Sequence, residues 1–278
     1  MDTSSISFTA HYTGQVWAKN GLSNPQWQTP TGRLLYHALS PFEWVGKRIV
    51  GGNIRTFLLQ RHLIIDHLLH QALERHPELQ VVEIACGLSP RGTRFCQQYP
   101  QLRYLEADLP AMAARKNKLL KKVGAYSQRH MALPLDFFRQ NELGLKALFA
   151  KHLNKAAPVL VITEGLINYF ELATLAPVWR ELSQLLKQFP QGYYLTDNYP
   201  LLDNDPNKAL METLSGLLGW VSRSNVNFHF NSLDAIAPHY QELGFSQVRV
   251  HNPEDYYARL SLPENRGNPL VHVLEMQV

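Results

Sequence analysis

Apolar residues return every three or four positions along the stretch from Ile54 to about Arg75. This spacing places them on one side of an α-helix, so it predicts a long amphipathic helix there. The recurring positions are Ile54, Phe57, Leu58, Ile65, Leu68, Leu69 and Ala72. The chain up to about Val50 is rich in Trp, Tyr, Thr, Pro and Gly instead. That composition predicts irregular structure with short helices, and we expect residues 1–50 to form a cap over a site.

Beyond Pro77 the pattern changes to short apolar runs bounded by turn residues, which predicts β-strands. Strands are predicted at Val81–Ala85, Leu102–Ala107, Gln128–Leu133, Val159–Thr163, Gly192–Asp197, Val248–His251 and Leu270–Met276. Helices are expected from Pro110, a favoured first helical residue, to about Lys122, and between Phe170 and Gln188. Strands that alternate with helices predict an α/β fold, in which a seven-stranded, mostly parallel sheet carries helices on both faces.

The stretch Pro200–Asn231 stands out because large apolar residues gather in it. They are Met211, Leu214, Leu217, Leu218, Trp220, Phe228 and Phe230. This composition suits either an apolar, lid-like insertion over residues 200–231 that selects a ligand, or an ordinary packed helical insertion. With 278 residues, 45% of them hydrophobic, the chain is long enough for one large domain, and we expect a single domain over 1–278.

Charge and cysteine content narrow the function classes. The formal net charge is only +4, and the densest basic stretch, Arg115–Lys122, is typical of the exposed face of a helix, so nucleic acid is not an expected partner. The two cysteines, Cys86 and Cys96, fit no zinc motif. Neither a signal peptide at MDTSSIS nor an apolar run of about 20 residues occurs, so no membrane contact and a cytoplasmic location are expected.

Ligands of open parallel sheets bind beyond the carboxyl ends of the strands. The residues at those places are Ala85–Gly92, Asp108, Leu133–Asp136, Glu164 and Asp197–Asn198. Several of these places offer a carboxylate, which can bind ribose hydroxyls or positively charged groups. The sequence therefore predicts a ligand site at this edge of the sheet.

The loop after the first predicted strand, Glu83–Gly92, contains small residues that let a backbone approach a ligand closely. It does not match G-x-G-x-x-G, because Ala85 fills the first place, and it lacks the Lys-[Ser/Thr] ending of a P-loop. An acid such as Glu83 near the strand end, followed by small-x-Gly, is typical of loops that bind S-adenosylmethionine. The alternative is an ordinary tight turn between a strand and a helix.

Asp108 lies about twenty residues after this loop, at the end of the second predicted strand. A carboxylate at that place can accept hydrogen bonds from both hydroxyls of a ribose. A helix-capping role for Asp108 is less expected, since Pro110 at the first helical position makes Leu109 the cap. Glu106, on the same face of the strand, is the rival for the ribose.

Arg61 falls within the apolar stripe of the long helix, between Leu58 and Ile65. A buried guanidinium needs an anionic partner. Three arrangements of Arg61 are possible. Its aliphatic part can lie along apolar surface while the guanidinium reaches water. Alternatively, the guanidinium can form a structural salt bridge or bind the carboxylate of a ligand.

Together these motifs resemble the leucine carboxyl methyltransferase family, which includes O-methyltransferases of polyketide biosynthesis. Four segments carry the resemblance: Gln60–Asp66, Val81–Arg94, Tyr104–Pro110 with Lys116, and Val159–Phe170. The last, a strand followed by Glu-Gly-Leu-x-x-Tyr, is the most specific. The resemblance covers about Arg55 to Phe170 and implies a Rossmann-like class I methyltransferase fold with an N-terminal helical cap, and S-adenosylmethionine as cofactor.

The resemblance also implies roles for individual residues. Arg61 would bind the methionyl carboxylate of the cofactor, and Asp108 its ribose. Glu164 would contact the methionyl amino group or its surroundings, and Tyr169 would line the site near the methyl group as the candidate catalytic residue. Further cofactor contacts are implied for Lys19, Glu83, Ala85, Cys86, Gly87 and Asp136.

The loop departs from the family pattern Gly-x-Gly-Leu-Asp-Thr-Arg, because Ala85 replaces the first glycine and Ser89-Pro90-Arg91 replaces Asp-Thr-Arg. Alanine adds only a methyl group, whereas the lost Asp removes a carboxylate. We therefore expect an S-adenosylmethionine-dependent O-methyltransferase, with a binding protein of impaired catalysis as the alternative. A nucleotide-dependent oxidoreductase is disfavoured by the missing G-x-G-x-x-G, and an RNA methyltransferase by the missing basic tract.

The expected acceptor is a carboxylate or hydroxyl of a small, polyketide-like molecule or of a peptide C-terminus. A carboxylate is already ionised at pH 7 and needs no base, whereas a phenol or alcohol needs one. His229, His239 and His251 are candidates for that base, but isolated histidines are more often structural. The sequence leaves the acceptor, the base and the oligomeric state open.

Overall fold

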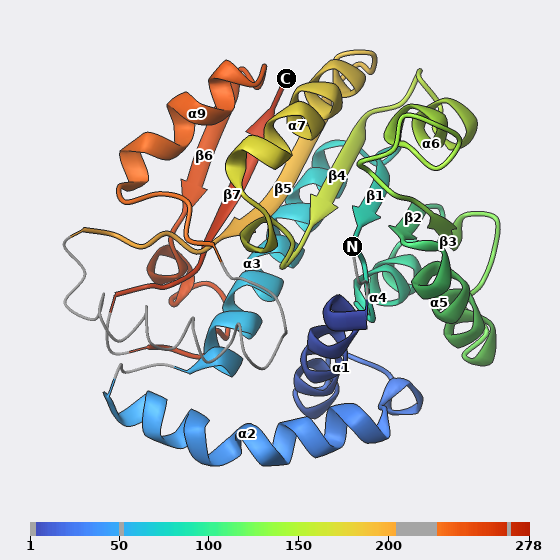
Figure 1. The fold of residues 1–278 in the computed structure, drawn as a ribbon. Helices are drawn as coiled ribbons and strands as arrows, with labels where there is room; N and C mark the ends of the chain where they lie inside the picture. The colour runs from blue at the N-terminus through green and yellow to red at the C-terminus, as the bar shows by residue number, and fades with distance from the viewer. Residues whose placement is uncertain (1–3, 50–52, 204–226, 266–267) are drawn as a thin grey trace.

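A sheet of seven strands, ordered β3-β2-β1-β4-β5-β7-β6, runs through the residues that the structure describes (Figure 1). The structure is a computed structural model, which describes residues 4–49, 53–203, 227–265 and 268–278. The strands are β1 (Gln80–Ile84), β2 (Arg103–Asp108), β3 (His130–Pro134), β4 (Val159–Thr163), β5 (Gly192–Asn198), β6 (Gln247–His251) and β7 (His272–Gln277). All seven lie where the apolar pattern predicts them, within one or two residues.

The strand directions confirm the predicted mostly parallel sheet. Strands β1 to β5 run parallel to one another, and β7 runs antiparallel to both β5 and β6. Every residue of β1, β4 and β5 is buried, as expected for central strands covered on both sides. The parallel arrangement brings the carboxyl ends of β1, β2, β4 and β5 to one edge, on the side where the N-terminal helices lie (Figure 1).

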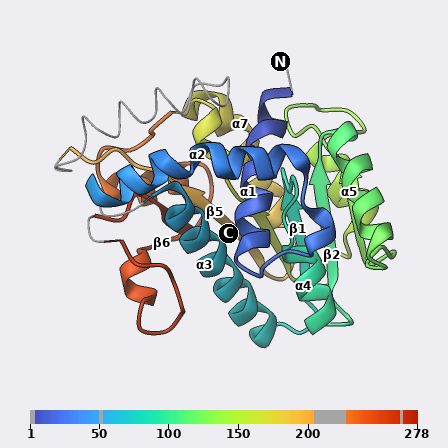
Figure 2. The ribbon, with the colours of Figure 1, turned by 90° about the horizontal axis from the view of Figure 1, so that it is seen from below.

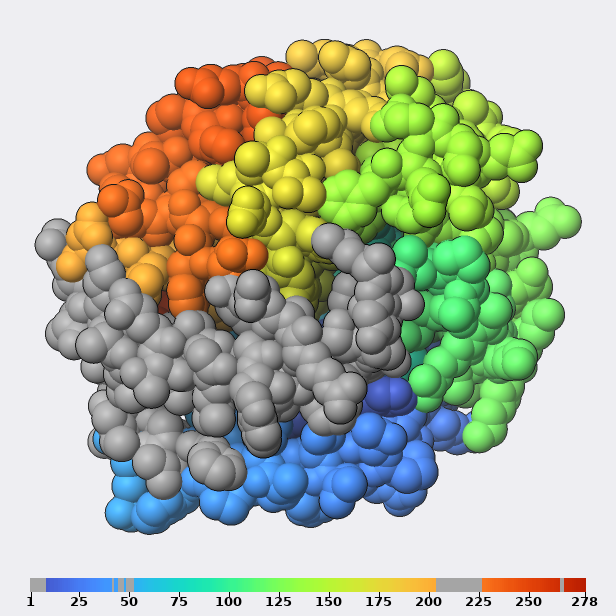
Figure 3. Space-filling view, viewed as in Figure 1, coloured from blue at the N-terminus to red at the C-terminus, as the bar shows by residue number. Residues whose placement is uncertain are grey.

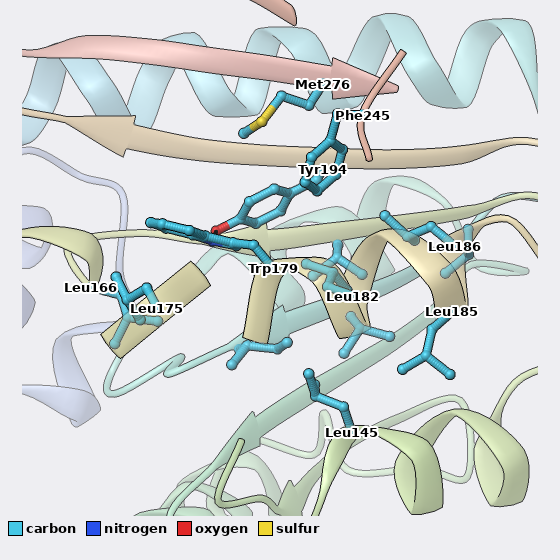
Figure 4. Packing of buried hydrophobic residues seen from close by; sticks show 14 of the residues in the cluster. Leu145, Leu166, Leu175, Trp179, Leu182, Leu185, Leu186, Tyr194, Phe245 and Met276 are labelled. Carbon is cyan, nitrogen blue, oxygen red and sulfur yellow. Dashed lines mark hydrogen bonds between the residues drawn. The ribbon is translucent and has the colours of Figure 1, made fainter. Parts of the chain in front are cut away.

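Helices cover both faces of the sheet. On one face, α3 (Ile54–Arg75) and α4 (Arg91–Gln98) pack on β1, β4 and β5 through an apolar cluster that includes Ile64, Ile65 and Phe95. On the other face lie α6 (Leu145–His152), α7 (Leu172–Leu186) and α9 (Ile236–Glu242). Trp179 of α7 packs beside Tyr194 of β5 in this second cluster (Figure 4). Helix α5 (Pro110–Lys122) packs beside β2 and β3.

The prediction of short helices before Val50 was wrong. Two longer helices, α1 (Ser4–Lys19) and α2 (Pro30–Ile49), form there, joined through a 3₁₀ turn, η1 (Pro25–Trp27). They pack on each other and on α3 through an apolar cluster containing Tyr12, Val16 and Leu58. Both helices lie below the carboxyl edge of the sheet in Figure 1 and cross in front of it in Figure 2, and Figure 3 shows their surface along the bottom of the molecule. The role of residues 1–50 as a cap over a site stays a prediction.

Most of the predicted lid at 200–231 lies outside the described residues. Its two described ends run side by side, because the backbone N–H of Leu201 donates to Phe230 and that of Asp203 donates to Asn231. The pair of ends leaves the sheet where β5 stops.

Candidate functional site

The loop after β1 forms a tight turn in which two residues have left-handed backbone. Gly87 has a φ of 50°, a conformation open to glycine, and Ala85 has a φ of 54°. Ala85 is the one non-glycine residue with positive φ in the described chain, and it stands where the family pattern has glycine. The substitution therefore retains the backbone shape of the family loop at a conformational cost.

The two carboxylates of β2 have separate tasks. Asp108 accepts from the backbone N–H of Gly87 at 2.8 Å and from that of Leu109 at 2.8 Å, so it lies against the loop. Its pKa is raised by burial, which these two hydrogen bonds partly offset. Leu109 is the cap of α5 and Pro110 its first residue, as predicted.

Glu106, the rival for the ribose, is fully buried beneath the end of the loop, where a Cβ at Gly92 would lie 2.4 Å from its Oε1. Its carboxylate lies 2.9 Å from the Lys116 ammonium and 3.2 Å from Nε2 of His130. Burial alone would raise the pKa of Glu106, but these two partners hold it below its usual range. Asp108 is thus the carboxylate of β2 that accepts a hydrogen bond from the loop backbone, whereas Glu106 is paired with Lys116 and His130.

Arg61 is buried, and three protein groups already hold its guanidinium. Nε donates to Glu164 at 3.1 Å, and Nη1 donates to Asp197 at 2.8 Å and to the hydroxyl of Tyr199 at 3.0 Å. Burial alone would lower the pKa of Arg61, but these partners hold it above its usual value. The salt-bridge alternative for Arg61 is therefore present in this structure.

One edge of that guanidinium remains open, because Nη2 of Arg61 donates no hydrogen bond to any described residue. It faces Gly165, which has a φ of 68°. A Cβ at Gly165 would lie 2.7 Å from this Nη2. Glycine at this place therefore lets the guanidinium of Arg61 pack directly against the backbone after β4.

A second buried arginine, to which the sequence reasoning gave no role, joins this cluster. Arg91 is 0% exposed and donates to Asp66 at 2.6 Å, Glu83 at 2.6 Å and Glu164 at 2.5 Å. Glu83 also accepts from the hydroxyl of Tyr104 at 2.7 Å. Glu83 is therefore engaged on the α3 and α4 side of the sheet. Arg91 could have been noticed as the arginine that ends the family's loop pattern.

His62 sits between Glu164 and Arg94 and is fully buried. Nε2 lies 2.8 Å from Nη2 of Arg94, and Nδ1 lies 2.9 Å from both Glu164 and Nη2 of Arg91. The imidazole therefore contacts two guanidinium groups and one carboxylate of the cluster. Burial alone would raise the pKa of Glu164, but His62, Arg91 and Arg61 hold it well below its usual range.

The remaining predicted residues lie nearer the border of the site. Tyr169 is half-buried in the 3₁₀ turn η2 (Ile167–Tyr169) after β4, against the second apolar cluster. Asp136 is half-buried after β3 and pairs with Arg139 at 3.3 Å. Cys86 is buried, and burial raises the pKa of its thiol well above the usual value, which fits a small loop residue. Lys19 is exposed in the last turn of α1 and makes no described contact with the cluster.

Helix α1 lies directly on the loop. A Cβ at Gly87 would lie 3.3 Å from Cβ of Ala10, and one at Gly14 would lie 3.4 Å from Cβ of Leu88. Further along the helix, the ring of Trp17 packs against His62 with centroids 4.8 Å apart. The helix therefore shields the loop and the ionic cluster from water.

In the described part of the chain, the His, Cys, Asp and Glu side chains form no group of three or more that could hold a metal ion. None of the helices in this part is both long and apolar enough to cross a membrane.

The family model described as leucine carboxyl methyltransferase matches residues 24–181, more than half of the chain. The chain belongs to the leucine carboxyl methyltransferase family. The region matched to this methyltransferase family contains Arg61, the loop after β1, Asp108 and Glu164–Tyr169, and it ends within α7. None of the curated proteins compared with the sequence matches it.

Solved structures agree with the methyltransferase fold. A candidate O-methyltransferase from Nostoc punctiforme is 14% identical, with a TM-score of 0.54, over 80% of this chain and 57% of that one. An O-methyltransferase family protein from Burkholderia thailandensis is 17% identical, with a TM-score of 0.54, over 80% and 57%. The S-adenosylmethionine-dependent methyltransferase SibL is 14% identical, with a TM-score of 0.53, over 89% and 58%. This chain therefore spans less than three fifths of these structures' length, and the likeness shows the Rossmann-like class I methyltransferase fold alone.

Proposed function

We propose that this protein binds S-adenosylmethionine at the carboxyl ends of β1, β2 and β4 and transfers a methyl group to an oxygen of its acceptor. The observation that carries the proposal is the Arg61 guanidinium at the β4 end, whose Nη2 donates to no described residue. A buried guanidinium with one open edge is suited to a carboxylate such as that of the methionyl group.

The other residues fit the rest of this cofactor. Asp108 lies against the loop with its carboxylate at the site edge, where it would accept from the ribose hydroxyls. The backbone of Ala85, Cys86 and Gly87 would allow close approach of the adenosyl group, and Asp136 lies after β3, where the adenine amine would be reached. Lys19 would need to turn inward from its exposed place on α1.

The buried cluster joins four carboxylates to three guanidinium groups and to the imidazole of His62. The carboxylates and guanidinium groups are those of Asp66, Glu83, Glu164 and Asp197, and of Arg61, Arg91 and Arg94. When bound, S-adenosylmethionine supplies an electrophilic methyl group on a positively charged sulfur. Glu164, held ionised by its partners, would face the positive amino end of the same molecule.

The catalytic task left to the protein is positioning and exclusion of water. Helix α1 covers the loop, and Tyr169 in η2 lies at the border between the β4 end and the apolar cluster. Tyr169 would therefore line the space next to the transferred methyl group. The acceptor would be a small molecule or a peptide carboxylate, with oxygen as the methylated atom.

Calorimetric titration with S-adenosylmethionine tests the proposal directly. The unaltered protein should bind at micromolar concentration, and Asp108→Ala should weaken binding about 10- to 100-fold, because hydrogen bonds to the carboxylate are lost. Asp255→Ala, an exposed carboxylate far from the loop in sequence, serves as the control and should bind normally. Absence of binding by the unaltered protein at millimolar cofactor would refute the proposal.

A protein that binds the cofactor without transferring methyl groups is the second candidate. It is favoured by Ala85, whose left-handed backbone departs from the glycine of the family pattern, and by the existing pairing of Arg61 with Asp197. Binding in the calorimeter, together with no methylation across a panel of small carboxylic acids, phenols and peptides, would support this candidate.

A further inference from the structure

Two buried polar side chains face each other where β5 stops. Asn198, the last residue of β5, is directly opposite His272, the first residue of β7, in the antiparallel register. Directly opposite residues have side chains on the same face of a sheet, with Cβ atoms about 5 Å apart. Asn198 is 0% exposed and His272 is 2% exposed.

Neither side chain is satisfied. Both amide atoms of Asn198 and Nδ1 of His272 are buried without a hydrogen-bond partner. The polar side chains just before Asn198 in β5 do have partners. Asp197 accepts from Arg61 and from the backbone of Gly165, and Thr196 forms a hydrogen bond with Thr163. A buried amide without partners is costly, so a pair of such groups side by side indicates a ligand absent from this structure.

Asn198 and His272 lie at the carboxyl edge of the sheet, on the face opposite to that of Arg61. Alternation along β5 turns Asp197 toward Arg61 and α3, and Asn198 toward the face of Tyr194 and α7. Strand β5 is two strands from β1, which corresponds to about 10 Å at the usual strand spacing. The pair therefore lies about 10 Å from the loop, a distance comparable to the length of a small aromatic molecule.

We propose that Asn198 and His272 bind the hydroxyl-bearing end of an aromatic methyl acceptor. This inference rests on the proposed function and specifies the acceptor of that site. An amide both donates and accepts, and an unprotonated imidazole nitrogen accepts, so together they match the donor and the lone pairs of a phenolic hydroxyl.

The chemistry of the pair favours a hydroxyl over a carboxylate. Burial alone lowers the pKa of His272 to about 4, so the ring is neutral at pH 7, and no charged group contributes to that shift. A carboxylate brought to this place would therefore meet no compensating cation and would lose its hydration. Apolar and aromatic neighbours on the same face, among them Tyr169 and Phe230, suit an aromatic ring.

The substitution Asn198→Leu separates a ligand role from a structural one. Leu has nearly the shape of Asn but no polar atoms. If the polar atoms of Asn198 serve only to bind a ligand, Asn198→Leu should leave the free energy of unfolding of the ligand-free protein unchanged or raise it. Asn117→Leu is the matched control, because the Asn117 amide is bonded to both the N–H and the carbonyl of Ala132. That variant should lose stability.

Binding is then measured by calorimetry on protein saturated with S-adenosylhomocysteine, with 2-naphthol and 2-naphthoate as probes that differ only in the polar group. The unaltered protein should bind 2-naphthol more tightly than 2-naphthoate. Asn198→Leu should weaken 2-naphthol binding at least tenfold, and His272→Leu should do the same, with S-adenosylhomocysteine affinity unchanged in both.

Several outcomes would overturn the inference. A less stable Asn198→Leu variant with unchanged 2-naphthol affinity would show that an ordered water satisfies the pair. Tighter binding of 2-naphthoate, or no binding of either probe at millimolar concentration, would refute the hydroxyl acceptor. If the unaltered protein does not bind S-adenosylhomocysteine, the proposed function itself fails, and this result is distinct from the others.

Discussion

Ala85 holds a backbone conformation that suits glycine better than alanine, with a φ of 54°. Left-handed backbone costs a residue with a Cβ about 1–2 kcal/mol, whereas glycine adopts it without this steric cost. Glycine also makes the unfolded chain more flexible, and this offsets part of the stabilisation of the folded state. We therefore expect Ala85→Gly to raise the free energy of unfolding by about 0.5–1 kcal/mol. Urea denaturation at pH 7 measures the change.

The control for this substitution is Ala107→Gly in β2, where the replaced alanine is buried and has no positive φ. It should lower stability by about 1 kcal/mol, because glycine adds unfolded-state entropy and removes a buried methyl group. Equal losses in both variants would mean that the backbone at Ala85 carries no cost.

Arg61 and Asp108 could be singled out from the sequence because each interrupts a regular pattern. Arg61 is a charge in an apolar stripe, and Asp108 follows a strand just before a helix-starting Pro110. The part played by Arg91 could not be seen in this way. Its three carboxylate partners come from α3, β1 and the end of β4, so only the folded chain brings them together.

At the scale of elements, Arg91 forms salt bridges that connect the start of α4 to α3, to β1 and to the residue after β4. It is fully buried and pairs with Asp66, Glu83 and Glu164. Replacing it with methionine would leave buried carboxylates without their main counter-charge, a change that costs about 3–5 kcal/mol. Arg91→Met should therefore lower the urea midpoint strongly at pH 7.

Arg94 offers a matched comparison on the same helix. Its side chain is 31% exposed and pairs with Asp66 alone among the carboxylates. Arg94→Met should cost about 1 kcal/mol, as expected for a partly exposed ion pair. If the two variants lose the same stability, burial of the Arg91 cluster does not contribute as argued.

The strands of the sheet could be predicted because short apolar runs bounded by turn residues are compatible with few structures other than buried strands. The helices before Val50 could not. Gly14 and Gly32 weaken the helical pattern, and Gly32 permits close packing of the two helices, since a Cβ there would lie 2.5 Å from the carbonyl oxygen of His11. Tertiary contact between α1 and α2 stabilises helices that local propensity alone disfavours.

For the molecule as a whole, buried histidines make stability depend on pH above the range where carboxylates titrate. His272 has the clearest effect, because burial lowers its pKa to about 4 from an ordinary value of 6.5. Between these pH values the unfolded chain binds a proton that the folded chain does not. Folding stability should therefore fall as the pH drops from 6.5 to 4, by about 3 kcal/mol in total from this residue.

Urea denaturation at pH 7 and pH 5 tests this contribution. The unaltered protein should lose stability between the two, and His272→Gln, which cannot titrate, should lose about 2 kcal/mol less over the same interval. His37→Gln, on the exposed side of α2, should show the loss of the unaltered protein. An identical pH dependence in all three proteins would mean that folding does not shift the pKa of His272 and that burial does not keep its imidazole neutral beside Asn198.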